Sequence, residues 1–323
     1  MATGRIYFHS PCFDGIVSAV LAWDFLEERD GWVAPLLRSV NYERRGVWLR
    51  EALEPPCAVV DFLYHPGSQF WADHHLTTFL DASARADFAA RRDERLLYDA
   101  AADSCAGLLW RRLHTDFGHR NSRYADLVVW ADKIDAARYE SVDEAFSASA
   151  PALRVALGLA GGEAGDHCAK LVRALRDLPL DEVASLPDVR ERYAKARTLF
   201  DAGLDRFKHA ARLEDDGIVV FDVDANDALV SRYAPYHFYP HARYSVGIVR
   251  WTGGAKLTAM RNPWREFPSV PLGWIAEGMG GGGHQRVAAV TLQGEQAARA
   301  EAVLGEFLRQ IRKAESGEAG QAP

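Results

Sequence analysis

Short apolar runs and amphipathic stretches alternate through the first third of the chain. The apolar runs are too short for ordinary helices, so they are interpreted as buried strands. In residues 15–28, by contrast, Ile16, Ala19, Val20 and Trp23 recur at the spacing of one helical face. Strands are predicted at 5–8, 33–37, 57–63 and 69–71, and helices at 15–28, 42–53 and 101–113. This alternation predicts an α/β fold, with a parallel sheet that carries helices on both faces.

The pattern changes in the second half of the chain. Residues 150–161, 165–177 and 188–214 are rich in Ala, Leu, Arg and Glu, which predicts helices, and Pro187 precedes the last of them. Further strands are predicted at 218–222, 245–251, 255–261 and 287–292, and helices at 272–278 and 296–313. We therefore expect a domain at 1–150, a helical connector at 151–215, a smaller α/β domain at 216–313 and a disordered tail at 314–323.

Composition narrows the classes of protein to consider. With 323 residues, 48% of them hydrophobic, the chain can bury a full core without disulfides, and its four cysteines show no framework spacing. The net charge of −7 disfavours a broad, non-specific grip on long nucleic acid. The apolar stretches are too short to cross a membrane, and a strand begins directly at the N-terminus. These features predict a cytoplasmic protein with no membrane segment.

Metal-binding residue types follow the predicted strands. His9, Cys12 and Asp14 come after the first strand, Asp61 lies at the end of another, and Asp73 opens the triplet Asp-His-His after the next. Asp132 and Asp135 follow a further apolar run at 127–131. In a parallel sheet the carboxyl ends of strands meet at one edge, where ligands bind. Carboxylates and imidazoles gathered there are what a divalent metal ion needs.

A second signal lies far downstream, where four consecutive glycines precede His284. Gly281, Gly282 and Gly283 would let backbone approach an anion closely, with His284 ready to contact it. Arg261, at the end of a predicted strand, is either a phosphate ligand or a surface arginine, and the sequence does not decide between them.

In this order the motifs resemble those of the DHH phosphoesterase family, named for the triplet seen here as Asp73, His74 and His75. The glycine run with His284 is similar to the DHH-associated C-terminal domain, so the resemblance spans residues 4–312. It implies a catalytic N-terminal domain that holds two divalent metal ions, usually Mn²⁺, and a smaller lobe that closes over the substrate.

The resemblance also implies roles for individual residues. His9 and Asp61 would bind one ion, with Asp61 bridging to the other. The ligands of the second ion would be Asp14, Asp61, His74 and Asp132. His75 would contact the phosphate or deliver a proton, while Asp73 and Asp135 would orient ligand imidazoles. Gly281, Gly282, Gly283 and His284 would bind the substrate, and Arg261 is a further candidate for this role because of its place at a strand end.

Cys12 departs from the family pattern, because relatives usually carry an aspartate at this position. A thiolate is a softer ligand than a carboxylate and prefers Zn²⁺ or Fe²⁺ to Mn²⁺. Cys12 could therefore ligate a different metal, leave the first site incomplete, or only pack against its neighbours.

The sequence thus predicts a metal-dependent phosphoesterase that hydrolyses short nucleotides through a metal-activated hydroxide. The substrate would be a dinucleotide, the end of a very short RNA or a nucleoside bisphosphate. The alternatives are a nucleotide-binding or sensing protein with an impaired metal site, and an inorganic pyrophosphatase. The sequence does not determine whether the protein forms a homodimer.

Overall fold

The computed structural model describes residues 3–160 and 165–316. The chain divides into two compact units. The first contains Met1–Tyr139 and Ser147–Ala194, and the second contains Glu140–Phe146 and Lys195–Pro323. Within the described residues, no helix is both long and apolar enough to cross a membrane.

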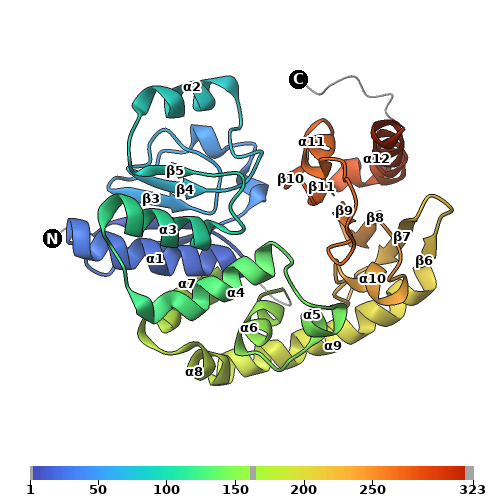
Figure 1. The fold of residues 1–323 in the computed structure, drawn as a ribbon, viewed down its shortest axis with the longest axis horizontal. Helices are drawn as coiled ribbons and strands as arrows, with labels where there is room; N and C mark the ends of the chain where they lie inside the picture. Colours follow the sequence, from blue (N-terminus) through green and yellow to red (C-terminus); the bar gives the residue numbers. More distant parts are fainter. Residues whose placement is uncertain (1–2, 161–164, 317–323) are drawn as a thin grey trace. The chain divides into compact units, whose positions relative to one another are not determined.

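The first unit is built on a five-stranded sheet with the order β2-β1-β3-β4-β5. Every pairing in it is parallel, which confirms the predicted α/β class (Figure 1). The strands are β1 (Arg5–His9), β2 (Leu36–Val40), β3 (Cys57–Val60), β4 (Phe70–Asp73) and β5 (Leu96–Tyr98). The short β5 was not predicted from the sequence.

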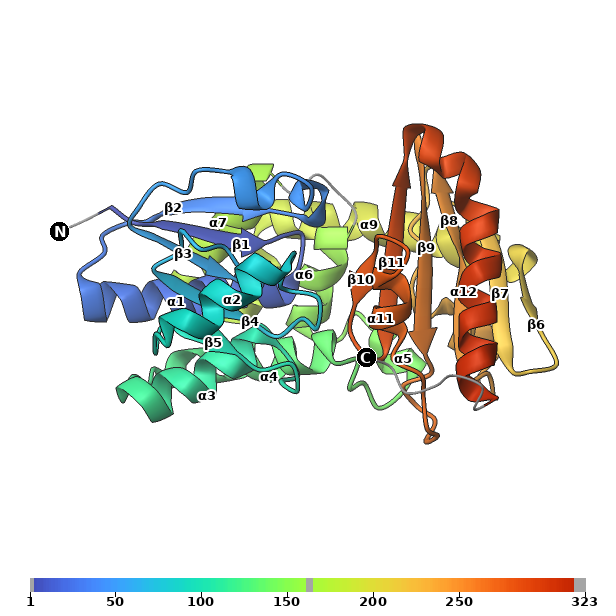
Figure 2. The same ribbon diagram turned by 90° about the horizontal axis from the view of Figure 1, so that it is seen from above.

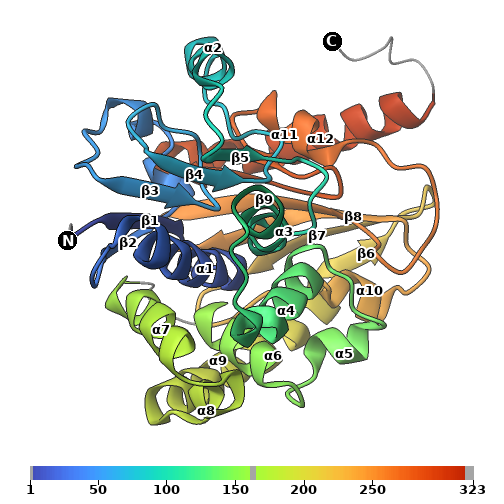
Figure 3. The same ribbon diagram turned by 60° about the vertical axis from the view of Figure 1, so that its left-hand side comes forward.

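Both faces of this sheet are covered, because alternate residues of each strand point to opposite sides. Ile6, Phe8 and Val60 join the core that holds the main helices. These helices are α1 (Phe13–Asp30), α3 (Cys105–Phe117), α4 (Ala125–Asp135), α6 (Pro151–Ala160), α7 (Gly165–Asp177) and α8 (Leu180–Ser185). On the opposite face, Val59 and Trp71 pack into a second cluster with residues of α2 (Ala82–Arg91). Figure 3 shows α7 alongside α1, in agreement with their contacts.

The helix predicted at 42–53 is wrong. Two short 3₁₀ helices, Tyr42–Arg44 and Trp48–Arg50, stand there instead. Trp48 is fully buried, and its indole nitrogen donates to the carbonyl of Leu63 at 3.0 Å. This long-range anchor fixes the segment against the sheet, so tertiary contacts override its helical propensity.

The helices of the middle region are close to their predicted positions. Helix α9 (Pro187–Ala210) begins in the first unit and continues into the second. Helices α6 to α8 contribute to the core of the first unit through residues such as Val155, Val172 and Val183. The expected connector, 151–215, is therefore divided between the two units.

The second unit holds a six-stranded mixed sheet with the order β10-β11-β9-β8-β7-β6 (Figure 2). Its strands are β6 (Ala211–Leu213), β7 (Ile218–Asp224), β8 (Tyr244–Trp251), β9 (Gly254–Arg261), β10 (Gly282–Gly283) and β11 (Val287–Gln293). Its helices are α5 (Val142–Phe146), α10 (Ala234–Phe238), α11 (Leu272–Glu277) and α12 (Ala300–Glu315). Phe307 and Ile311 of α12 are buried in the core formed with this sheet. The expected disordered tail begins too early, because Ala314 and Glu315 belong to α12, and its residues 317–323 lie outside the described residues.

Candidate metal centre

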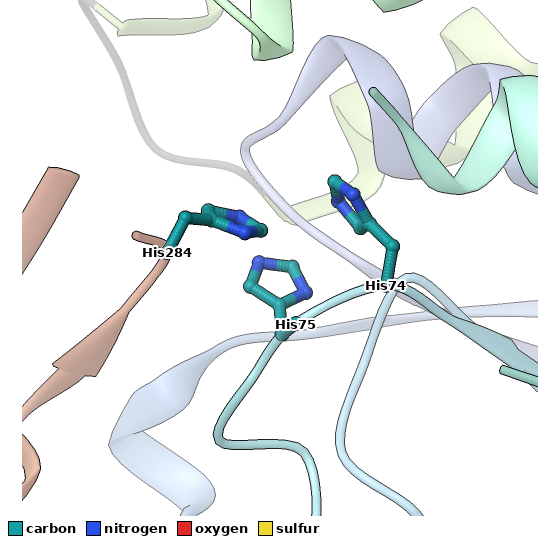
Figure 4. A group of neighbouring side chains, drawn as sticks. All are labelled: His74, His75 and His284. Atoms are coloured by element: carbon teal, nitrogen blue, oxygen red, sulfur yellow. The ribbon is translucent and has the colours of Figure 1, made fainter. Parts of the chain in front are cut away.

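Three strands of the parallel sheet end at the same edge, and each is followed by residues that can bind a metal. His9 ends β1, Asp61 follows β3, and Asp73 ends β4. His74 and His75 come next, with ring centroids 4.8 Å apart (Figure 4). The parallel register places these strand ends together, as the sequence predicts.

The first group of potential ligands is His9, Cys12 and Asp61, whose donor atoms all lie within 4.8 Å of one another. His9 Nδ1 is 3.3 Å from Asp61 Oδ2. Cys12 is the residue before α1 and has an extended backbone there. Its thiol therefore stands in the group, which favours ligation of a metal by Cys12 over packing alone, and the role of this residue stays a prediction.

The second group is Asp14, His74 and Asp135, again with donor atoms within 4.8 Å. His74 Nε2 lies 3.6 Å from Asp14 Oδ2 and 3.4 Å from Asp135 Oδ2. The other ring nitrogen, Nδ1, is 3.0 Å from the carbonyl oxygen of Ala102. Because a carbonyl only accepts, Nδ1 carries the proton in the neutral ring, and Nε2 is left as the metal-binding atom.

The third group is Asp61, Asp73 and His75. Asp73 Oδ1 is 2.7 Å from His75 Nδ1 and accepts from the amide of His74 at 2.8 Å, while Thr78 donates to Oδ2. These bonds fix the carboxylate of Asp73, which in turn fixes the ring of His75. Burial raises the pKa of Asp73, but the charge of His75 and its hydrogen bond outweigh burial, so the pKa is lowered overall.

Asp14 is held by the beginning of α3. Its carboxylate accepts from the backbone amides of Cys105 at 2.7 Å and Ala106 at 2.8 Å. The preceding residue, Ser104, caps the helix by accepting from the amide of Gly107 at 2.8 Å. A helix N-terminus stabilises negative charge, so α3 both positions Asp14 and favours its ionised form.

Asp132 and Asp135 differ in position, although both lie on α4. Asp132 Oδ1 accepts from Ser104 Oγ at 2.5 Å, and a Cβ added at Gly107 would lie 2.2 Å from that oxygen. Asp132 is therefore set against α3 and belongs to none of the groups above, whereas Asp135 stands with Asp14 and His74. The assignment of Asp132 as a metal ligand and of Asp135 as an orienting residue remains a prediction, and the geometry favours exchanging them.

The charge balance of these groups fits a divalent cation. Burial and the neighbouring Asp14 and Asp135 raise the pKa of Asp61 well above its usual range. Burial and Asp135 likewise raise the pKa of Asp14 to about 6. Asp61 Oδ1 is buried and accepts no hydrogen bond from a described residue, and no described lysine or arginine pairs with Asp14 or Asp61. A cation bound among these carboxylates would relieve their repulsion.

Two local features of the backbone, at Asp61 and at Gly15, shape the site and could not be predicted from the sequence. Asp61 has a φ of +54°, in the left-handed region that non-glycine residues seldom adopt. Such strain is typical of functional sites, where the surrounding structure enforces it. Gly15 lets α1 begin close to β1, because a Cβ there would lie 2.1 Å from the carbonyl oxygen of His9.

In the second unit, the glycine run forms a tight strand pairing. Gly282 and Gly283 of β10 pair with Ala289 and Ala288 of β11. A Cβ at Gly283 would lie 2.3 Å from the carbonyl oxygen of Val287, and its φ is +146°. Glycine is therefore needed there for the fold itself. The proposed contact of Gly281, Gly282, Gly283 and His284 with substrate stays a prediction.

Arg261 is buried rather than exposed. Its guanidinium donates to the carbonyls of Asn262 at 3.2 Å and Phe267 at 3.1 Å, and it lies 4.4 Å from the ring of Phe267. Burial and the nearby Arg286 lower its pKa. The interpretation of Arg261 as a surface arginine is therefore wrong, while its contact with phosphate stays a prediction.

Solved structures of similar fold match nearly the whole chain, and three of them have TM-scores above 0.5 with the following similarities. A pGpG-specific phosphodiesterase, PggH from Vibrio cholerae, is 16% identical with a TM-score of 0.65, and the match covers 94% of this chain and 99% of that one. The DHH domain of a member of the s1p family of ribosomal proteins is 11% identical with a TM-score of 0.59, covering 96% and 86%. An exopolyphosphatase-related protein from Bacteroides fragilis is 12% identical with a TM-score of 0.52, covering 97% and 92%.

No protein-family model matches the sequence, and no curated protein matches it. The likeness in three dimensions nevertheless extends along both units. The chain has the fold of DHH-domain proteins, which confirms at the level of the fold the resemblance that its motifs indicate.

Proposed function

We propose that this protein is a metal-dependent phosphoesterase that acts on short nucleotides. The observation that carries the proposal is the set of three neighbouring ligand groups at one edge of the parallel sheet, two of which share Asp61. These groups combine buried carboxylates, imidazoles and one thiol, a donor set that suits divalent transition-metal ions.

Two ions fit the arrangement of the donors. His9, Cys12 and Asp61 would hold one ion, and Asp14, His74 and Asp135 the other. Asp61 would bridge them, because its Oδ2 is 3.3 Å from His9 Nδ1 while its Oδ1 is 3.7 Å from His74 Nε2. When bound, such a pair activates water as a nucleophile and stabilises the negative charge of the phosphoryl oxygens. Mn²⁺ is the expected metal, with Zn²⁺ or Fe²⁺ favoured to the extent that Cys12 binds as a thiolate.

His75 and Asp73 would support the reaction from the protein side. Asp73 holds Nδ1 of His75 at 2.7 Å and raises the pKa of the imidazole against the opposing effect of burial. A protonated imidazole in a fixed orientation can donate a hydrogen bond to a phosphoryl oxygen or a proton to the leaving oxygen. His75 is thus proposed as the catalytic residue and Asp73 as the group that positions it.

A short nucleotide is proposed as the substrate for two reasons. The net charge of −7 disfavours a long polyanion. The protein of similar fold with a TM-score of 0.65 acts on pGpG, a linear dinucleotide. In the second unit, the glycine run, His284 and Arg261 are proposed to contribute to binding of the substrate.

The test is hydrolysis of a defined panel under defined metals. Wild-type protein, stripped and reloaded with Mn²⁺, Zn²⁺ or Fe²⁺, is assayed against pGpG, a short RNA, a nucleoside 3′,5′-bisphosphate and pyrophosphate. Asp61→Asn should abolish both metal retention and turnover. Asp116→Asn is the matched control, because Asp116 is on the surface of α3 and pairs with Arg112. Absence of bound metal and of hydrolysis in the wild type, with nucleotide binding retained, would instead support a sensing protein.

A further inference from the structure

The first unit contains a cavity of about 250 Å³ whose lining residues do not belong to the metal centre. It is lined by residues from α1, from the second half of α3 and from the loop that follows α3. Leu21 and Leu113 are almost fully buried, and with the half-buried Trp110 they give the cavity apolar walls. These three side chains are therefore available to contact an apolar or aromatic group.

The acidic side chain in the wall, Asp24, is already satisfied. Its carboxylate lies 3.0 Å from His119 Nε2 and accepts from Asn121 Nδ2 at 3.0 Å. His119 is in turn 3.1 Å from Glu28 through its other ring nitrogen. This network ties the loop after α3 to α1, so the cavity has a defined wall rather than a mobile one.

The two arginines that line the cavity, unlike Asp24, make no such hydrogen bonds or ion pairs with described residues. Arg111 and Arg120 are exposed residues that line it, and neither side chain forms an ion pair or hydrogen bond with a described residue. The next residue on α3, Arg112, lies outside the lining and pairs with Asp116 at 2.5 Å. His114 adds a further donor to the lining. The cavity thus combines apolar walls with two guanidinium groups that form no ion pair or hydrogen bond within the described chain.

We propose that this cavity is a second ligand site, which binds a small organic anion with an aromatic or branched apolar body. The apolar body would occupy the space beside Leu21, Trp110 and Leu113. The anionic head would accept hydrogen bonds from Arg111 and Arg120, which suit a carboxylate or a phosphate. The volume limits the ligand to a molecule smaller than an ordinary drug-sized compound. This inference does not depend on the proposed phosphoesterase activity, since none of these residues belongs to the metal centre.

The test uses three probes with the full-length protein and isothermal titration calorimetry. The probe 3-phenylpropionate has both the apolar body and the charge, 3-phenylpropan-1-ol lacks the charge, and propionate lacks the aromatic body. We expect saturable binding of the first, at one molecule per chain, and at least about tenfold weaker binding of the other two. Benzylphosphonate, titrated in the same way, distinguishes a preference for phosphate from one for carboxylate.

The variant Arg111→Gln/Arg120→Gln should weaken binding of 3-phenylpropionate by about tenfold or more. The control variant Arg112→Gln/Arg123→Gln removes the same charge from the half-buried Arg112 and the exposed Arg123, both outside the cavity, and should bind as the wild type does. The proposal is overturned if no probe binds saturably, if the alcohol binds as tightly as the acid, or if both double variants lose affinity equally. The last result would mean that net charge alone attracts the probe.

Discussion

Two aspartates on one helix give the sharpest test of the metal centre. Asp132 and Asp135 lie one turn apart on α4, and the sequence alone favours Asp132 as the ligand. The structure puts Asp135 Oδ2 3.4 Å from His74 Nε2, while Asp132 Oδ1 accepts from Ser104 Oγ at 2.5 Å. We therefore predict that Asp135→Asn removes a metal ligand and that Asp132→Asn does not.

The two variants should change the stability of the metal-free protein to different extents. Asp135 raises the pKa values of Asp14 and Asp61 by repulsion, so replacing it with a neutral amide relieves that repulsion and should raise Tm. Asp132→Asn keeps an acceptor for Ser104 but loses a charge-assisted hydrogen bond, a cost of about 1 kcal/mol. Burial and the nearby Asp103 raise the pKa of Asp132 despite that bond, so removing the charge offsets the loss and Tm should change by less than the about 2–4 °C that the hydrogen bond alone would give.

Metal binding should separate the variants further. Loss of a residue outside the ligand sphere typically costs about 10–100-fold in metal affinity, and loss of a ligand should cost at least the upper end of that range. We expect Asp135→Asn to lose the Tm increase on addition of Mn²⁺ and Asp132→Asn to retain it. Differential scanning fluorimetry and metal analysis after dialysis provide both readouts. If Asp132→Asn loses the metal while Asp135→Asn keeps it, our placement of the second ligand group is wrong.

Four further outcomes are expected. Asp61→Asn should retain the fold, because asparagine tolerates the φ of +54°, yet bind no metal and show no turnover; metal content equal to that of the wild type would contradict the bridging role. Cys12→Asp should raise Mn²⁺ content and Mn²⁺-supported activity at the expense of Zn²⁺ or Fe²⁺, as measured by metal analysis of both proteins; unchanged preference would mean that the thiol is not a ligand. Gly283→Ala should destabilise the second unit by about 1–3 kcal/mol, because alanine is strained at φ +146° and its Cβ would lie too close to the Val287 carbonyl. Denaturant unfolding measures this loss, and a free energy of unfolding equal to that of the wild type would contradict the prediction. His284→Ala should raise KM or lower kcat with metal content unchanged, and steady-state kinetics identical to the wild type would remove His284 from the substrate site.

The order of strands and the residues that follow them could be predicted from the sequence alone. Buried strands of a parallel sheet are short, continuous apolar runs, so the polar residues that directly follow them can be recognised in the sequence. The parallel connection then brings the strand ends to one edge, so His9, Asp61 and Asp73 were expected together and lie together. Local pattern was sufficient here because one rule of chain topology converts sequence position into spatial position.

Other features depend on contacts between distant residues, and the sequence carries no local sign of them. Residues 42–53 form two short 3₁₀ helices because Trp48 is anchored to Leu63, far along the chain. The glycine run, expected to be a phosphate cradle, is also required by the close pairing of β10 with β11. In both cases the deciding energy is tertiary packing, which propensity does not encode.

The choice between Asp132 and Asp135 shows the same limit within the site. Residues three apart on a helix share a face, so periodicity cannot tell which of them points at the metal groups. The close packing at Gly107 makes the choice between the two aspartates. Because Gly107 has no side chain, Asp132 packs against α3, and Asp135, one turn further along α4, lies beside His74. The sequence by itself thus determined the class of fold and the kinds of ligand atom. The packing of α4 on α3 decided which carboxylate completes the site, since that depends on a helix–helix contact that only the folded chain makes.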